Sequence, residues 1–481
     1  MLQNEREIMK NIIKFSILSI TLCIATVPEQ VRAESLLEIY QQALQGDPQI
    51  HEAEARRLAA LESKPQARGV LLPQIQATGS WDETQTTGTS FSIIDQSGRT
   101  FDQDATNTNW GFSLRQSVFR WDQIVNLRRA DKTVTKAEAV REAAQQDLIV
   151  RVAQRYFDVL AAEDRLTSRQ ANSEAIARQL EQAKQRFEVG LIAITDVQES
   201  QAAYDQSVAD EIGAKRTLAT AREYLREITG QYVAQLDAPG EDFPLLNPTP
   251  NDEKSWVDLS LGQNLNLVAS RLDEELARDE ISFRRNGYYP SLDLLISTGE
   301  SASKGDVSVT PVIGSGMNVF DDTTNRDQIS LQLTVPLFAG GYNSSRVKES
   351  VYLHRASREQ LQRVTRETER QARDAYLGVH SEMSRVKALS QAVASSQTAL
   401  QATQAGYEVG TRTIVEVLNS QFSLYVAITN FYQSRYDYIM NALRLKQAAG
   451  TLQVQDLEKI DQWLRVRPTP EEAEAARAAE S

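Results

Sequence analysis

The sequence of 481 residues is poor in the residue types that build metal centres and disulfides. It has one cysteine, Cys23, and three histidines, His51, His354 and His380. Zinc sites, thiol nucleophiles and disulfide frameworks need these residues in clusters, so the sequence predicts no metal and no cofactor. The scattered histidines also leave no nucleophile–base arrangement, and we therefore predict that the protein is not an enzyme.

Proline and glycine are also scarce, with 13 and 22 residues, and aromatic residues make up 7% of the chain. Few helix-breaking residues favour long regular elements, and a globular enzyme of this size normally has a more aromatic core. Lys and Arg number 52 against 65 Asp and Glu, which gives a net charge of −13. Such a chain lacks the basic surface that sequence-independent nucleic-acid binding requires, so no nucleic-acid partner is expected.

The first 33 residues have the pattern of a secretory signal peptide. Two lysines give a basic start, residues 12–27 are mostly apolar, and Ala33 ends a small-residue cleavage pattern. We expect the mature chain to begin at Glu34 and to have lost Cys23. A retained membrane anchor is the alternative, which the polar residues inside the short apolar run disfavour. The signal predicts export from the cytoplasm.

An internal repeat organises the rest of the sequence. Residues 187–190, Phe-Glu-Val-Gly, match residues 407–410, Tyr-Glu-Val-Gly, at an offset of 220. Upstream the offset drifts to 217, as loop insertions would produce. Four prolines mark a linker between the repeats, and the end of the chain is rich in Ala and Glu and is predicted to be disordered. The predicted organisation is signal peptide 1–33, first structural repeat 34–230, linker 231–251, second structural repeat 252–450 and C-terminal segment 451–481.

Each repeat is predicted to contain a helix, two strands, a long helix and a further helix. The first helices are expected at 35–68 and 255–285, and the long helices at 122–187 and 343–407. Some 65 residues at ~1.5 Å per residue make a rod of roughly 100 Å. A seven-residue frame, which predicts a left-handed supercoil, follows both rods: Val159, Leu166, Ser173, Leu180 and Phe187, then Val379, Val386, Val393, Leu400 and Tyr407. For the rods alone, an ordinary coiled coil is the simpler interpretation.

Alternating apolar and polar residues predict four strands. The segments that alternate are 74–81, 110–115, 292–297 and 329–337. Strands of about ten residues with one apolar and one polar face suit an outer-membrane barrel, although a soluble sandwich shows the same alternation. Residues 82–106 and 299–326, rich in Thr, Ser, Gly and Asp, are expected to be loops.

The number of strands decides between a barrel and a sandwich. Four strands cannot close a membrane barrel, since about eight is the smallest number, and an open sheet edge cannot exist in lipid. Several chains must then share one barrel, and three chains give 12 strands. The predicted fold is mostly α with a β-barrel part: a trimeric 12-stranded barrel with four strands per chain, continued by a barrel of long helices and built from two internal repeats.

Three segments of the sequence resemble the TolC family of outer-membrane channel-tunnels. They are residues 186–197 (Arg-Phe-Glu-Val-Gly-Leu-Ile-Ala-Ile-Thr-Asp-Val), 335–341 and 407–418. The resemblance covers nearly the whole mature chain. It implies a homotrimer in the outer membrane of a Gram-negative bacterium, a long periplasmic α-helical barrel, and a passive exit channel for drug efflux and type I protein secretion. It also implies two partners, a periplasmic adaptor and an inner-membrane efflux pump or ABC exporter.

The resemblance further implies a gate formed by Thr195, Asp196, Tyr407 and Arg412. In the family these positions lie at the closed periplasmic end, where Arg412 and Tyr407 would bind the carboxylate of Asp196. Opening would occur by untwisting of this coiled-coil end. Judged from the residues alone, the same pair is a solvated surface contact worth roughly 0–1 kcal/mol.

Two more groups of residues follow from the resemblance. Glu416 matches one acidic ring of the pore entrance, whereas Asn419 stands where the family has a second acidic residue, a departure that argues against strong cation binding. Glycine after a helix predicts a C-cap. The resemblance adds a docking surface for the adaptor at the two tips, formed by Val189, Gly190, Leu191, Val409, Gly410 and Thr411.

A structural coiled-coil surface protein, or a trimeric adhesin without channel activity, is the alternative function. The alternating strands inside each repeat argue against it, as do the helices on both sides of each strand pair.

Overall fold

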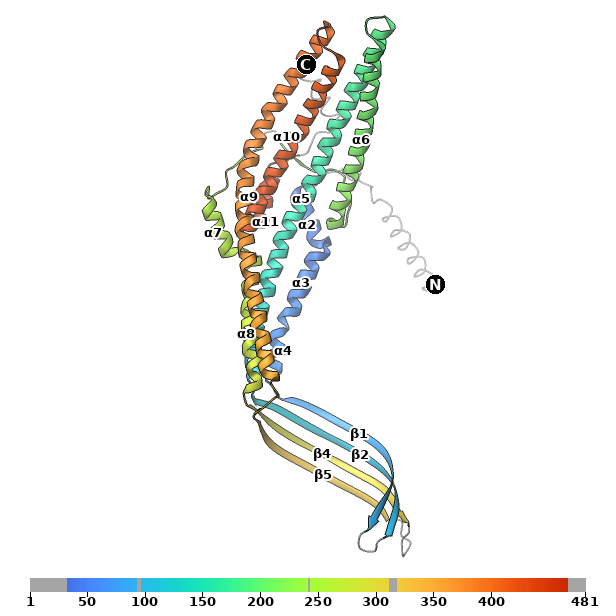
Figure 1. Cartoon of the computed structure of the whole chain (residues 1–481), viewed down its shortest axis with the longest axis vertical. Coiled ribbons are helices and arrows are strands. Elements are labelled where there is room, and N and C mark those ends of the chain that lie inside the picture. Colours follow the sequence, from blue (N-terminus) through green and yellow to red (C-terminus); the bar gives the residue numbers. More distant parts are fainter. Residues whose placement is uncertain (1–32, 93–96, 241–242, 311–317, 466–481) are drawn as a thin grey trace, which may run out of the picture.

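The computed structural model of the chain describes residues 33–92, 97–240, 243–310 and 318–465. Almost all of the predicted signal peptide and the whole predicted disordered tail lie outside these residues. The described chain is a long bundle of helices that ends in a four-stranded sheet (Figure 1). The mostly α architecture with a β part is as predicted.

Two very long helices run the length of the bundle. They are α5 (Trp121–Glu188, 68 residues) and α9 (Tyr342–Glu408, 67 residues). Neither contains proline, so nothing interrupts the backbone hydrogen bonds. Each is followed by a shorter helix that returns beside it, α6 (Ile194–Thr229) after α5 and α10 (Ile414–Ala448) after α9 (Figure 1). The predicted rods at 122–187 and 343–407 are confirmed.

The seven-residue frame forms a buried seam along much of both rods. Val159 is 2% exposed, Leu180 5% and Val379 1%. The polar position of the frame, Ser173, is also buried, and it accepts a hydrogen bond of 3.3 Å from Ser207 on α6. The frame therefore joins each long helix to its neighbours, as a coiled-coil pattern predicts.

The first helix of each repeat is broken, and the single helices predicted at 35–68 and 255–285 are wrong. The first is three helices: α2 (Leu36–Gly46), α3 (Pro48–Leu61) and α4 (Ser63–Gly69). The second is α7 (Glu253–Gln263) and α8 (Leu265–Arg284), with a 3-10 turn η1 (Arg285–Tyr288).

Capping side chains explain two of these breaks. Asp47 accepts a hydrogen bond of 3.1 Å from the backbone N–H of Gln49, and Pro48 begins α3. Asn264 accepts a hydrogen bond of 3.0 Å from the backbone N–H of Leu267 and so begins α8. A short polar side chain that caps a new helix competes with continuing the old one.

The sheet has the order β1-β2-β4-β5, and all its pairs are antiparallel. Its strands are β1 (Gln74–Ser92), β2 (Ser97–Phe119), β4 (Ser291–Thr310) and β5 (Asn318–Thr334). The first hairpin belongs to one repeat and the second to the other, and the two join through β2 and β4.

The predicted loops at 82–106 and 299–326 are wrong, because the strands run through most of both segments. The ladder between β1 and β2 continues in register from Gln74 opposite Arg115 to Ser92 opposite Ser97. Strand pairing uses backbone groups, and threonine favours strands, so the hairpins extend after the apolar alternation ends.

One face of the sheet is apolar near the helices, and the other is polar. The apolar face carries the alternating residues of the sequence pattern, with Ile75 73%, Trp110 49% and Ile329 78% exposed. The opposite face carries a row of four directly paired polar residues, one from each strand: Gln76, Ser113, Ser297 and Gln328.

A belt of packed, buried residues lies in the middle of the helical bundle. Tyr156 and Phe157 on α5 are buried there against α10, α2 and the short helix α11 (Val454–Asp461). Residues 231–240 and 243–251 contribute to the belt, where β3 (Ala238–Pro239) pairs with β6 (Leu464–Arg465). The hydroxyl of Tyr156 donates a hydrogen bond of 2.6 Å to the carbonyl oxygen of Asp237, which fixes this connection to α5.

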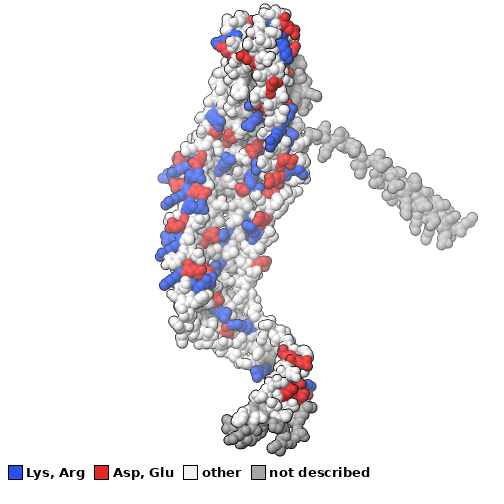
Figure 2. Space-filling model, turned by 45° about the vertical axis from the view of Figure 1, so that its right-hand side comes forward, with Lys and Arg blue, Asp and Glu red and all other residues white. Residues whose placement is uncertain are grey.

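Charges of both signs are mixed over the helical body (Figure 2). Some of them join helices: Lys132 on α5 lies 2.7 Å from Asp279 on α8, and Arg129 lies 2.8 Å from Glu280. No helix in the described part of the chain combines the length and the apolar character needed to cross a membrane.

Candidate gate and docking tips

The two helical hairpins end in turns of the same construction. α5 is followed by a turn at Gly190, with φ 75°, and α9 by a turn at Gly410, with φ 79°. The N–H of Leu191 donates 2.9 Å to the carbonyl of Arg186, and the N–H of Thr411 donates 2.8 Å to the carbonyl of Gly406. These bonds satisfy the last carbonyls of each helix, and only glycine adopts such a φ without strain. The glycine C-caps predicted from the sequence are confirmed.

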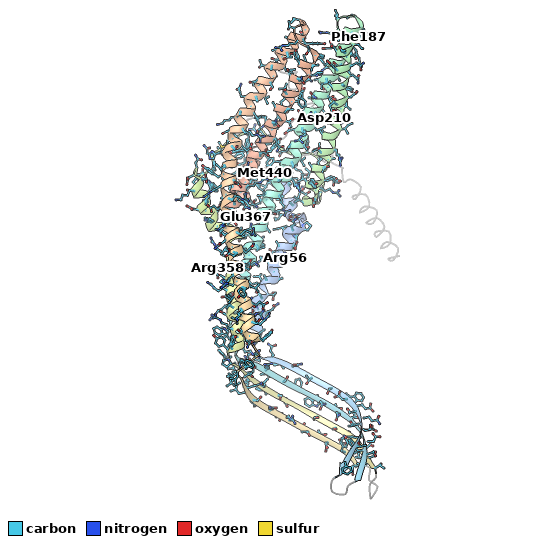
Figure 3. All side chains as sticks on the ribbon, in the orientation of Figure 1. Arg56, Phe187, Asp210, Arg358, Glu367 and Met440 are labelled. Atoms are coloured by element: carbon cyan, nitrogen blue, oxygen red, sulfur yellow. The ribbon has the colours of Figure 1, made fainter. Side chains whose placement is uncertain are left out.

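Apolar side chains surround both glycines and are open to solvent. Val189 is 70% exposed, Leu191 73% and Val409 76%, and Thr411 is exposed as well. Phe187, labelled at the end of α5 in Figure 3, is 41% exposed. Each tip thus presents apolar side chains around a glycine that has none, and the tips lie at the end of the bundle farthest from the sheet (Figure 1).

Arg412 has a partner on its own helix. Its Nη1 lies 3.0 Å from Oε1 of Glu416, one turn along. The Glu416 carboxylate also accepts 2.8 Å from the backbone N–H of Thr413, and the Thr413 side chain accepts in return from the N–H of Glu416. The hydrogen bond from the Thr413 backbone and then that from Arg412 hold the pKa of Glu416 below its usual range.

Asp196 lies in the first turn of α6, next to Thr195. The Thr195 hydroxyl and Oδ1 of Asp196 are 3.5 Å apart. Within the described part of a single chain, no ion pair joins Asp196 to Arg412. The pairing implied by the family resemblance therefore stays a prediction, and in an assembly it would have to form between neighbouring tips.

Tyr407 is held from the other hairpin. The guanidinium carbon of Arg186, on α5, lies 5.0 Å from the centre of the Tyr407 ring, on α9. This cation–π contact joins the ends of the two long helices directly, and both residues belong to the last turn before a glycine cap.

Sequence reasoning did not assign a role to Arg186 or to its counterpart Gly406, which occupies the same position in the second motif. A Cβ at Gly406 would lie 2.7 Å from Cγ of Arg412. Glycine therefore leaves room for the Arg412 side chain to fold back over the end of α9. The signal was present in the sequence as a mismatch between two otherwise similar motifs.

The two residues predicted for the pore entrance lie on one side of α10. Glu416 is half-buried and Asn419 is exposed, and the carbonyl of Asn419 accepts 2.9 Å from the hydroxyl of Ser423. In the single chain the charge of Glu416 is balanced by Arg412. Among the residues that the structure describes, no group of three or more His, Cys, Asp or Glu is placed to hold a metal ion.

Comparison with known proteins assigns the chain to a family. A model of the outer membrane efflux protein family matches residues 39–231 and 256–451. The chain belongs to the outer membrane efflux protein family. It is 36% identical over 449 residues to outer membrane protein TolC of Vibrio cholerae, which covers 93% of this chain and 98% of the relative.

Two further similarities extend the comparison. The chain is 28% identical over 438 residues to the alkaline protease secretion protein AprF of Pseudomonas aeruginosa, covering 90% of this chain and 88% of the relative. The solved Campylobacter jejuni CmeC outer membrane channel matches with a TM-score of 0.68 and 15% identity, over 91% of this chain and 94% of that one. That likeness shows a shared fold.

Membership of the efflux family settles the broad function. The chain is an outer-membrane efflux channel that extends into the periplasm, as the sequence resemblance implied. Its family and relatives are channel proteins rather than enzymes. The alternative of a coiled-coil surface protein or adhesin is wrong, since the family match covers both repeats, with their helices and strands.

Proposed function

We propose that three copies of the chain form one channel through the outer membrane and the periplasm. The supporting observation is the sheet itself, in which β1 and β5 are the outer strands and each pairs with one neighbour within the described chain. These strands have 19 and 17 residues, so each leaves a long row of backbone donors and acceptors unpaired. In lipid, β1 of one chain must pair with β5 of the next, and three chains close 12 strands.

The helices extend the same assembly into the periplasm. Each chain contributes two helical hairpins of similar length, so three chains place six tips around one axis. The exposed apolar side chains at Gly190 and Gly410 are the docking surface for a periplasmic adaptor, with Val189, Leu191, Val409 and Thr411 around them. The adaptor links the channel to an inner-membrane efflux pump or an ABC exporter, which supplies the energy.

Drug efflux and type I protein secretion are the proposed transport roles. The family name refers to efflux, and the name of the relative AprF refers to secretion of alkaline protease. One exit channel can serve both, because the chain supplies the conduit and its partners supply the cargo and the energy.

The closed state is held at the tips by weak polar contacts. Thr195, Asp196, Tyr407 and Arg412 form the gate, and Arg412 exchanges its contact with Glu416 for Asp196 of the neighbouring hairpin as the tips come together. Exposed contacts of this kind are worth about 0–1 kcal/mol each, so an adaptor can break them. Opening is then an untwisting of the coiled-coil end, and Glu416 and Asn419 line the entrance.

Planar-bilayer conductance tests this proposal. Combining Arg412→Glu with Tyr407→Phe places like charges opposite Asp196 and removes a hydroxyl, so single-channel conductance should rise severalfold. Arg363→Glu is a matched control, since the exposed Arg363 pairs at 2.9 Å with Glu367 on α9, which lies far from the tips (Figure 3). If the double variant conducts no better than the unmodified channel, these residues do not form the gate.

A further inference from the structure

In a membrane barrel the polar face of the sheet lines the interior, because the apolar face meets lipid. A Cβ at Gly299 would lie 2.5 Å from the carbonyl oxygen of Trp110, and one at Gly305 would strike the carbonyl oxygen of Asp104. Both glycines point to the polar side of β4, where the backbone of β2 comes close to them. Gly79 points to the apolar side, and there the nearest atom is 3.9 Å away. The polar face is the inner wall of the barrel.

Two phenylalanines interrupt this polar wall near the hairpin ends. Phe101 lies directly opposite Gly88, and Phe320 directly opposite Gly305. Their positions in the strands place both on the inner face, opposite to the face of Trp110 and Ile329. Both pairs join a glycine on the first strand of a hairpin to a phenylalanine on the second, so the arrangement is part of the internal repeat.

The glycines let the rings lie flat on the wall. A Cβ at Gly88 would lie 2.5 Å from Cζ of Phe101, and one at Gly305 would lie 2.9 Å from Cζ of Phe320. Each ring therefore leans across its glycine instead of standing up into the channel. Both side chains are half-buried, so part of each ring remains exposed. Three chains would set six such rings around the outer end of the barrel.

Carboxylates lie on the same wall beside Phe320, whereas Phe101 lies farther out, because it is six residues or about 20 Å along β2 from Asn107, which shares a row with both carboxylates. Asp322 is two residues from Phe320, about 7 Å along the strand. It begins a row of directly paired residues that ends at the second carboxylate: Asp322, Ser303, Asn107 and Asp82. Ser303 donates 2.7 Å to Asn107, so the middle of the row is neutral and the acids stand at the two sheet edges. Among described side chains of this face, the basic ones are Arg326, four residues from Asp322, and Arg115, bonded to Asp293.

Aromatic rings beside carboxylates recognise one kind of molecule in particular. A flat organic cation stacks on a ring, is attracted by its π-face and is balanced by a nearby carboxylate. Phe320 and Asp322 supply this pair, and Phe101 supplies a second ring farther out on the same wall. We infer that Phe101, Phe320, Asp82 and Asp322 form an exit collar that binds planar aromatic cations passing out of the channel. The inference rests on the proposed trimer, since only there does the collar close into a ring around the cargo.

Ethidium is a suitable probe because it is planar, cationic and fluorescent. Its fluorescence anisotropy is titrated with the purified full-length trimer in a non-ionic detergent, and tetramethylammonium serves as a cation without a ring. Ethidium should bind, tetramethylammonium should not displace it at equal ionic strength, and Phe101→Leu combined with Phe320→Leu should weaken binding about tenfold. Asp82→Asn combined with Asp322→Asn should weaken it severalfold.

The matched control removes two phenylalanines from the opposite face. Phe91 and Phe112 are 68% and 52% exposed on the apolar side, so Phe91→Leu combined with Phe112→Leu should leave the affinity for ethidium unchanged. Leucine keeps the apolar volume, and native mass and bilayer conductance of each variant show that the channel is intact. Equal affinity in the collar variant and the control overturns the collar alone. Failure of the unmodified chain to form a conducting trimer overturns both the collar and the proposed assembly.

Discussion

Arg412 is held by a contact that can be exchanged at little cost. Its ion pair with Glu416 is more than 40% exposed on both sides, and solvent screening makes such exposed pairs weak. This local contact was readable from the sequence, because Thr413 and Glu416 have the spacing of a capping box and Arg412 stands four residues before Glu416. A partner of Arg412 on another tip cannot be predicted from the sequence, because it depends on how separate hairpins approach one another.

The contact between Arg186 and Tyr407 could not be found from spacing either. The two residues are 221 positions apart and meet only because α5 and α9 end at the same height. The contact holds the Tyr407 ring against the end of α5. We therefore expect Arg186 to position Tyr407 within the proposed gate. Arg186 also places a positive charge at the tip, two residues before Glu188 in the sequence.

Arg186→Ala should loosen the gate without opening it fully. Losing a partly exposed cation–π contact costs about 0.5–1 kcal/mol per chain, so we expect conductance in a planar bilayer to rise by a factor of about two to five. Arg186→Lys should retain part of the effect. Arg178→Ala is the control, because Arg178 is exposed and pairs along its own helix, with Glu174 at 3.0 Å. Equal conductance of the Arg186 and Arg178 variants would remove Arg186 from the gate.

At the scale of elements, the sequence predicted regular structure well and its interruptions poorly. The long helices followed from an unbroken seven-residue frame without proline, and their ends agree within one residue with α5 and α9. The breaks at Asp47 and Asn264 were missed, although Asp-Pro and an asparagine before a leucine are ordinary helix-start signals. Periodicity continued across both breaks and outweighed those local signals.

The strands were predicted too short for a physical reason. Apolar alternation reports where one face meets lipid, whereas strand pairing depends on the backbone. Beyond Trp81 and before Thr108 both faces of the first hairpin are mostly polar, so the alternation ends while the ladder continues. The part of each hairpin beyond the apolar band contains Phe101 and Phe320, and the collar was therefore hidden in segments read as loops.

The turns at the tips are the last elements to consider, and substitutions at Gly410 test their role. A non-glycine residue at φ 79° costs roughly 1–2 kcal/mol, but asparagine tolerates the left-handed region. Gly410→Asn should keep most of the export activity, whereas Gly410→Arg should abolish it by covering the docking surface. Drug sensitivity of cells measures export, and native mass measures the trimer. Loss of the trimer in Gly410→Arg would instead assign Gly410 a purely structural role.

At the scale of the whole molecule, the number of strands per chain is what requires several chains to share one barrel. Four strands with one apolar face predict a shared barrel from the sequence alone. The sheet order β1-β2-β4-β5 leaves two long strands at the edges of the sheet. The residues at these edges determine assembly together with the helices. The inner wall, the collar and the gate all acquire their function from the same threefold arrangement.

Native mass measurement of the detergent-solubilised protein tests that arrangement most directly. We predict one dominant species with three times the mass of the mature chain, stable to dilution because β1 and β5 of neighbouring chains pair along their whole length. A well-behaved monomer in detergent, with its sheet intact, would contradict the shared barrel.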